Sequence, residues 1–238
     1  MSEYDWLTCT SAYDMLDYLH RLGKTSSRKS RLVGCAFCRR FWYLFEDELR
    51  QAVNVAEQHA DGLVQEEEVK AAREALWNPE GVFIGLEDDT IEDSVAWAAR
   101  GVLMPDGRAG LFTVLQSLHY TIQMEWAGDH KLWVEIPGTK ISAAFDEEWS
   151  YQCGIIREIF GNPCRPVMID PVWLTWNRGA IAKLARSIYD DGAFDTLPIL
   201  ADALEEAGCL DGSMLSHCRL GKDHVPGCWV IDLLLGKE

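Results

Sequence analysis

The sequence predicts a predominantly all-α protein with an irregular multi-helix globular fold. Apolar residues recur at helical spacing along most of the chain, with helix-capping residues before these stretches and Gly or Asn-Pro after them. A hydrophobic fraction of 48% beside 25% charged residues is typical of a folded globular protein. The 238 residues are enough for one large helical core. No linker-like composition divides the chain, so we expect a single helical domain over residues 1–238.

Four helices are predicted before the first strong interruption, Asn78-Pro79. They cover residues 11–22, 27–45, 47–60 and 66–77. The segment 27–45 is apolar on nearly every face, whereas a surface helix would carry a narrower apolar stripe. We therefore expect this segment to be buried.

The middle of the chain has a mixed pattern. Residues 91–103 and 111–126 fit helices, while alternating apolar and polar residues at 131–136 fit a short strand equally well. A small β element within residues 110–143 therefore stays open. Residues 78–145 are also the segment that a variable insertion or subdomain would occupy.

Helical patterns return in the C-terminal third. They predict a helix at residues 147–160, a second that opens at Asp170-Pro171 and carries Trp173 and Trp176, and further helices at residues 179–189, 196–207, 213–219 and 228–235. Asp146 is the expected cap of the first of these helices, and Asp170-Pro171 fits the start of the second. The last helix is as apolar as segment 27–45, so we expect the N-terminal helices to pack against the C-terminal ones.

Charge and apolar patterning restrict the environment of the protein. With 38 acidic and 22 basic residues the net charge is −16, which disfavours nucleic acid and anionic lipid as partners. Apolar runs are far shorter than a membrane span requires, and the N-terminus does not resemble a signal peptide. We therefore expect a cytoplasmic protein without a membrane partner, in which the eight cysteines stay reduced.

Cysteine and histidine residues form the main chemical signal. The candidate metal ligands are Cys35, Cys38, His217, Cys218, His224 and Cys228. Cys35 and Cys38 are spaced i, i+3 and would share one helix face, and two of the four C-terminal residues could complete a closed zinc site. The simpler interpretation, which we favour over zinc, is that these cysteines fill the core and that the protein has no cofactor.

No standard enzyme motif is present, including the P-loop, the dinucleotide-binding glycine pattern, the serine nucleophile elbow and HExxH. We therefore assign no catalytic and no cofactor-binding residue. The acidic composition favours a protein-interaction or regulatory module whose partner is a protein, and a basic protein would complement the charge. The alternative is a small thiol- or zinc-dependent enzyme that uses the C-terminal histidines and cysteines.

Two blocks of sequence resemble an uncharacterised bacterial family. The first is Cys35-Ala-Phe-Cys38-Arg-Arg-Phe-Trp42. The second begins at Ile199-Leu-Ala-Asp-Ala-Leu-Glu-Glu-Ala-Gly-Cys209 and continues to Gly227-Cys-Trp-Val-Ile-Asp-Leu-Leu-Leu-Gly236. Similar proteins stand alone or are attached to proteins with repeat-companion segments. The resemblance implies that the candidate ligands lie in the shared parts, and it implies no activity.

Overall fold

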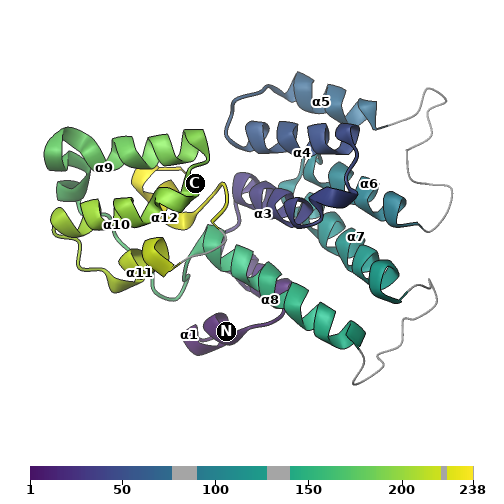
Figure 1. Cartoon of the computed structure of the whole chain (residues 1–238), viewed down its shortest axis with the longest axis horizontal. Helices are drawn as coiled ribbons and strands as arrows, with labels where there is room; N and C mark the ends of the chain where they lie inside the picture. Colours follow the sequence, from purple (N-terminus) through teal and green to yellow (C-terminus); the bar gives the residue numbers. More distant parts are fainter. Residues whose placement is uncertain (77–89, 128–139, 221–223, 238) are drawn as a thin grey trace. The chain divides into compact units, whose positions relative to one another are not determined.

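The computed structural model describes residues 1–76, 90–127, 140–220 and 224–237 (Figure 1). These residues form helices and connecting segments without a strand, which confirms the all-α fold class. The strand considered at 131–136 lies outside the described residues. Within the described ranges, no helix combines the length and the apolarity needed to cross a membrane.

The chain divides into two compact units. The central unit comprises Thr10–Cys153, and the terminal unit combines Met1–Cys9 with Gly154–Glu238. The chain therefore passes from one unit to the other after Cys9 and again within helix α8 (Lys140–Phe160). A single domain over residues 1–238 stays a prediction. So does the insertion or subdomain at 78–145, a segment whose described helical residues belong to the central unit.

The central unit is arranged around helix α3. Its helices before α8 are α2 (Ala12–Arg21), α3 (Ser27–Arg40), η1 (Trp42–Leu44), α4 (Asp47–Ala60), α5 (Glu66–Ala75), α6 (Ile91–Val102) and α7 (Gly107–Ala127). Helix α3 packs against α4, α6 and α7, and its Val33 and Phe37 are inaccessible to solvent. The predicted burial of this segment is thus confirmed. The α-helix ends at Arg40 instead of Phe45, because the aromatic run after it has low helix propensity and forms a 3-10 turn.

Two glycines allow α6 and α7 to approach closely. A Cβ atom on Gly101 would lie 2.8 Å from the carbonyl oxygen of Gly110. Nearby, Arg31 of α3 donates hydrogen bonds to the carbonyls of Val102 and Met104. These carbonyls at the end of α6 would otherwise lack helical partners, so a buried guanidinium satisfies them and complements the helix dipole.

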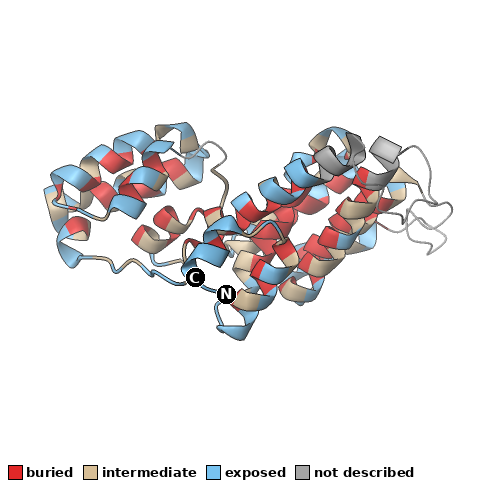
Figure 2. Cartoon of the chain, turned by 90° about the horizontal axis from the view of Figure 1, so that it is seen from below, coloured by how far each residue is buried: buried red, intermediate tan, exposed pale blue. Residues whose placement is uncertain are grey.

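The terminal unit has its own apolar core. Its remaining helices are α1 (Glu3–Thr8), α9 (Pro171–Asp191), η2 (Phe194–Thr196), α10 (Leu197–Glu206), α11 (Gly212–Leu220) and α12 (Trp229–Leu235). Buried side chains of α9, α10, α11 and α12 pack together, and Figure 2 shows buried residues along the helices of this unit. Helix α9 is interrupted between Trp176 and Gly179, in agreement with the two separate helices predicted there.

Two predictions about helices need correction. Helix α1 was not predicted, because Trp6 is its only buried residue and so short a helix has no apolar periodicity. Its sequence signal is the capping box of Ser2 and Asp5. Helix α8 begins at Lys140, so Asp146 lies inside the helix and does not cap it. An aspartate is a preferred cap, but a helix also tolerates it at an exposed interior position.

Candidate metal centre

Four side chains of the terminal unit meet in its interior. Each of Glu158, His217, His224 and Cys228 offers a ligand atom, and these atoms all lie within 4.8 Å of one another. We call these four residues the donor group. Glu158 belongs to the end of α8, His217 to α11, and Cys228 is the N-cap of α12, shortly after His224. The donor group therefore joins segments that are distant in the sequence.

Local turn signals place these segments. Gly161 ends α8 in the left-handed region, with φ of 65°, and Gly227 adopts φ of 93° directly before Cys228. Both backbone conformations favour glycine because it has no Cβ. Asp211 caps α11 by accepting a hydrogen bond from the backbone N–H of Met214 at 3.0 Å. The sequence thus fixes where each ligand-bearing element begins or ends.

The carboxylate of Glu158 interacts with both histidines. Its Oε1 lies 2.9 Å from Nδ1 of His224, and its Oε2 lies 3.3 Å from Nε2 of His217. The same Nε2 lies 3.2 Å from Sγ of Cys228. The two imidazole rings meet edge to face with centroids 4.9 Å apart. Every member of the donor group therefore contacts at least one other member.

The donor group is shielded from solvent. The exposed fraction of the side chain is 16% for His217, 10% for Glu158 and 5% for His224, and Cys228 is inaccessible. Burial acts to raise the pKa of Glu158, but hydrogen bonds from the two histidines outweigh it and leave this pKa below its ordinary value. Burial beside this carboxylate raises the pKa of the Cys228 thiol. The buried Nε2 of His224 has no hydrogen-bond partner within the described ranges.

Trp229 forms one side of the donor group. Its ring lies 5.2 Å, centroid to centroid, from the ring of His217. The same indole also lies against Gly161, where an added Cβ atom would come within 3.2 Å of the ring. The absence of a side chain at Gly161 therefore leaves room for Trp229 beside the metal-ligand candidates.

Three of the six predicted candidates belong to the donor group: His217, His224 and Cys228. Cys218 does not, and lies in the apolar core of the terminal unit. Successive helical residues point about 100° apart, so His217 and its neighbour Cys218 face different surroundings. Burial raises the pKa of Cys218 to about 12, which suits a core thiol.

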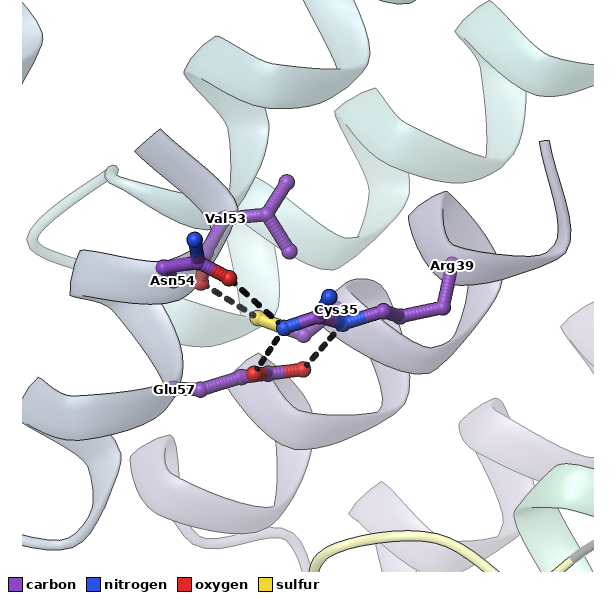
Figure 3. A network of polar contacts seen from close by, with 5 residues as sticks. All are labelled: Cys35, Arg39, Val53, Asn54 and Glu57. Atoms are coloured by element: carbon purple, nitrogen blue, oxygen red, sulfur yellow. Dashed lines mark hydrogen bonds and ion pairs between the residues drawn. The ribbon is translucent and has the colours of Figure 1, made fainter. Parts of the chain in front are cut away.

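Cys35 and Cys38 are buried in the central unit. The Sγ atom of Cys35 lies 3.9 Å from the carbonyl of Val53, and Figure 3 shows it beside an ion pair in which Arg39 contacts Glu57 at 2.6 Å. Burial raises the pKa of both thiols. These surroundings suit two small core residues. Their part in a shared zinc site with the C-terminal residues stays a prediction.

Sequence reasoning missed Glu158. The sequence feature that could have indicated it is its position as a carboxylate on an otherwise apolar helix face. Ile155, Ile156 and Ile159 around it are all buried. A carboxylate in such a position requires a compensating partner. However, its partners follow about 60 residues later, and no local spacing connects them.

The composition of the donor group fits a metal ion. Two imidazoles, a thiol and a carboxylate are the nitrogen, sulfur and oxygen ligands that proteins use for zinc and related transition metals. The buried donor group could therefore hold a metal.

Comparisons with known proteins give no relative. No family model, no curated protein and no solved structure matches the chain. The interpretation of the donor group consequently depends on its own geometry.

Proposed function

We propose that the terminal unit binds one zinc ion through Glu158, His217, His224 and Cys228, and that the ion stabilises the unit. The supporting observation is the convergence of four buried ligand atoms within 4.8 Å. They come from α8, α11 and the segment that enters α12. A single ion would therefore connect three parts of the unit that the sequence keeps apart.

Two of the separations between donors lie close to the spacing of tetrahedral ligands. With zinc bonds of about 2.0–2.3 Å, tetrahedral ligand atoms lie roughly 3.3–3.7 Å apart. The distances from Nε2 of His217 to Oε2 of Glu158 and to Sγ of Cys228 are 3.3 and 3.2 Å. All four ligand atoms lie within 4.8 Å of one another, so one ion could contact all four after the side chains adjust. Magnesium and calcium are disfavoured, because they prefer sites made of oxygen ligands.

A structural ion fits the site better than a catalytic one. A catalytic zinc site usually has three protein ligands and leaves the fourth position open to water or substrate. Here four protein donors are present, and each side chain is at most 16% exposed. The ion would thus be surrounded by protein.

The alternative of a thiol enzyme has less support. In such an enzyme the histidine is the base, and the nucleophile and the orienting carboxylate normally bond to opposite nitrogens of its ring. In the donor group, Cys228 and Glu158 both face Nε2 of His217. The Cys228 thiol is also inaccessible, and its pKa is raised, which disfavours the reactive thiolate.

We assign the zinc-stabilised chain a role in protein interaction or regulation. The net charge of −16 supports a basic protein as the partner, since opposite charge accelerates encounter and selects among partners. A pull-down with the native zinc-loaded protein at low and high salt tests this role. Stoichiometric capture of a basic protein that weakens with salt is expected, and failure to retain a specific protein at low salt contradicts it.

Elemental analysis tests the metal site. Full-length protein without a histidine tag, purified under reducing conditions, should contain about one zinc per chain. Glu158→Gln and Cys228→Ser should each reduce the zinc content strongly. The first substitution removes the charged oxygen ligand of the donor group, and the second removes its sulfur ligand.

Matched controls exist for both substitutions. Cys218→Ser changes a buried thiol outside the donor group, and Glu205→Gln changes an exposed carboxylate on α10. Both should retain the metal. Wild-type protein that takes up no zinc from an equimolar supply, or control variants that lose it equally, would contradict the proposal.

A further inference from the structure

Helix α1 is docked on the part of the terminal unit that carries the donor group. It contains six residues, and Trp6, 1% exposed, is the only one that is buried. A helix this short is unstable in isolation, since helix nucleation costs more than a few hydrogen bonds recover. The contacts of α1 with the rest of the terminal unit therefore maintain its structure.

Arg157 of α8 makes the main polar contacts with α1. Its Nε and Nη2 donate to the carbonyl of Trp6 at 3.1 and 2.9 Å, and Nη2 also donates to the carbonyl of Cys9 at 2.7 Å. Asn162 adds a hydrogen bond from Nδ2 to Glu3 at 2.8 Å. The guanidinium satisfies carbonyls at the C-terminal end of α1, where a positive charge is favoured.

The residues that hold α1 are neighbours of the residues that form the donor group. Arg157 precedes Glu158 directly, and Asn162 follows Gly161, on which the Trp229 ring packs. Trp229 in turn follows Cys228 and contacts the ring of His217. The last turn of α8 and the residues just after it thus contact α1 with some side chains and the donor group with others.

We infer that metal binding and the docking of α1 are coupled, so that the metal-loaded terminal unit holds the N-terminal helix and the metal-free unit releases it. This inference rests on the proposed zinc site. An ion bound to Glu158 fixes the end of α8 to α11 and to the start of α12. The three hydrogen bonds from Arg157 require that same end of α8 to be in place.

The coupling must be reciprocal. If zinc strengthens the docking of α1 by a given factor, docking strengthens zinc binding by the same factor. Residues 1–9 belong to the terminal unit, whereas Thr10 begins the central unit. Release of α1 would therefore free the N-terminal segment up to the point where the chain enters the central unit.

Hydrogen exchange of the full chain with and without zinc tests the inference. We expect the backbone amides of residues 4–9 to exchange at least about tenfold more slowly in the zinc-loaded protein, within the range of typical coupling between sites. Peptides from α4 in the central unit serve as the internal reference, and their exchange should be unchanged. Zinc affinity is measured in parallel by competition with a chelator.

Arg157→Gln separates the docking of α1 from the metal ligands. This variant should show fast exchange of residues 4–9 in both states and a loss of zinc affinity equal to the protection factor that zinc gives the wild type. Arg219→Gln is the control, because Arg219 forms its ion pairs with Asp202 and Glu205 of α10. If Arg157→Gln fails to fold, Asn162→Ala provides a milder change, and the wild-type comparison remains decisive by itself.

The outcomes separate the two proposals. Absence of zinc binding to the wild type would overturn the proposed function and, with it, the coupling. Tight zinc binding with unchanged exchange of residues 4–9 would overturn the coupling alone. Slower exchange with zinc, abolished in Arg157→Gln, would support both.

Discussion

The two units bury charged groups in different ways, and helix α8 carries an example in each. Glu148, in the central unit, lies 3.3 Å from Nε of Arg40. Burial raises its pKa, and the arginine offsets this only in part. Glu158, in the terminal unit, is also buried, but two histidines hold its pKa below the ordinary value. The same residue type on the same helix thus has opposite electrostatics, decided by the partners that other segments supply.

The surroundings of each carboxylate also differ in kind. In the central unit, α6 packs on α7, and α3 packs on α4, α6 and α7. Glu148 is a buried carboxylate of this unit. The terminal unit has an apolar core of its own, and beside it a group of four polar side chains that contact one another. We therefore expect removal of a metal to affect one unit, and loss of apolar packing in α3 to affect the other.

Chelation should have the largest effect. Structural zinc contributes about 10–16 kcal/mol of folding free energy in small zinc-finger domains. Treatment with a strong chelator should lower the melting temperature of the terminal unit and leave that of the central unit nearly unchanged. Differential scanning calorimetry with and without chelator measures both transitions. A thermogram that does not change would contradict the zinc site.

Phe37→Ala should have the next largest effect, in the central unit. Phe37 is inaccessible to solvent, and truncation of a buried phenylalanine typically costs about 3–5 kcal/mol. Denaturant unfolding measures this loss, while the zinc content should stay that of the wild type. Tyr43→Ala is the control, because Tyr43 is 63% exposed and its truncation should change stability far less. Equal effects of the two substitutions would show that α3 is not the core helix.

Gly110→Ala tests the close contact between α6 and α7. A new Cβ atom would meet the carbonyl of Gly101, a backbone atom that cannot turn aside. We expect a loss of about 1–3 kcal/mol, typical of overpacking, measured by thermal unfolding. Gly154→Ala is a suitable control, since a Cβ atom there meets nothing within 4 Å. A stable Gly110→Ala variant would indicate that the two helices lie further apart.

Glu148→Gln should have the smallest effect, and its sign depends on pH. Because the pKa of Glu148 is raised from 4.5, the folded state holds the proton more tightly than the unfolded state does. Its contribution to stability is therefore greatest at acid pH and falls as the pH rises through 4.5 toward the raised value.

Near neutral pH the Glu148→Gln variant should consequently be slightly more stable than the wild type, by less than about 1 kcal/mol. The difference should vanish below about pH 4, where both side chains are neutral. Denaturant unfolding across this pH range measures it. Glu147→Gln is the control, because that side chain is 77% exposed. Destabilisation by Glu148→Gln at neutral pH would mean that the Arg40 ion pair outweighs burial.

Local sequence signals predicted most of the helices. Ser11 caps α2 and Asp170 caps α9, as expected from the preference of these side chains for free backbone N–H groups. Continuous apolarity predicted the burial of α3. The predicted start of α8 was wrong, because Asp146, a residue type that often caps helices, lies inside this one.

The candidate site was predictable only in part. His217, His224 and Cys228 lie within 12 residues of one another, so their spacing alone drew attention to them. Glu158 precedes them by about 60 residues and has no motif that indicates its partners. Cys218 lies in the same stretch of sequence as these three residues, yet helix geometry turns it into the apolar core.

By itself, the sequence of this protein determined the fold class, the approximate helix boundaries and the region that carries histidine and cysteine chemistry. These properties depend on interactions between residues a few positions apart, which periodicity and capping preferences express directly. Only the tertiary structure decided that Glu158 joins the histidines and that residues 1–9 dock on the C-terminal part of the chain. Such contacts depend on how whole helices pack, and no local pattern of residues records which distant surfaces meet.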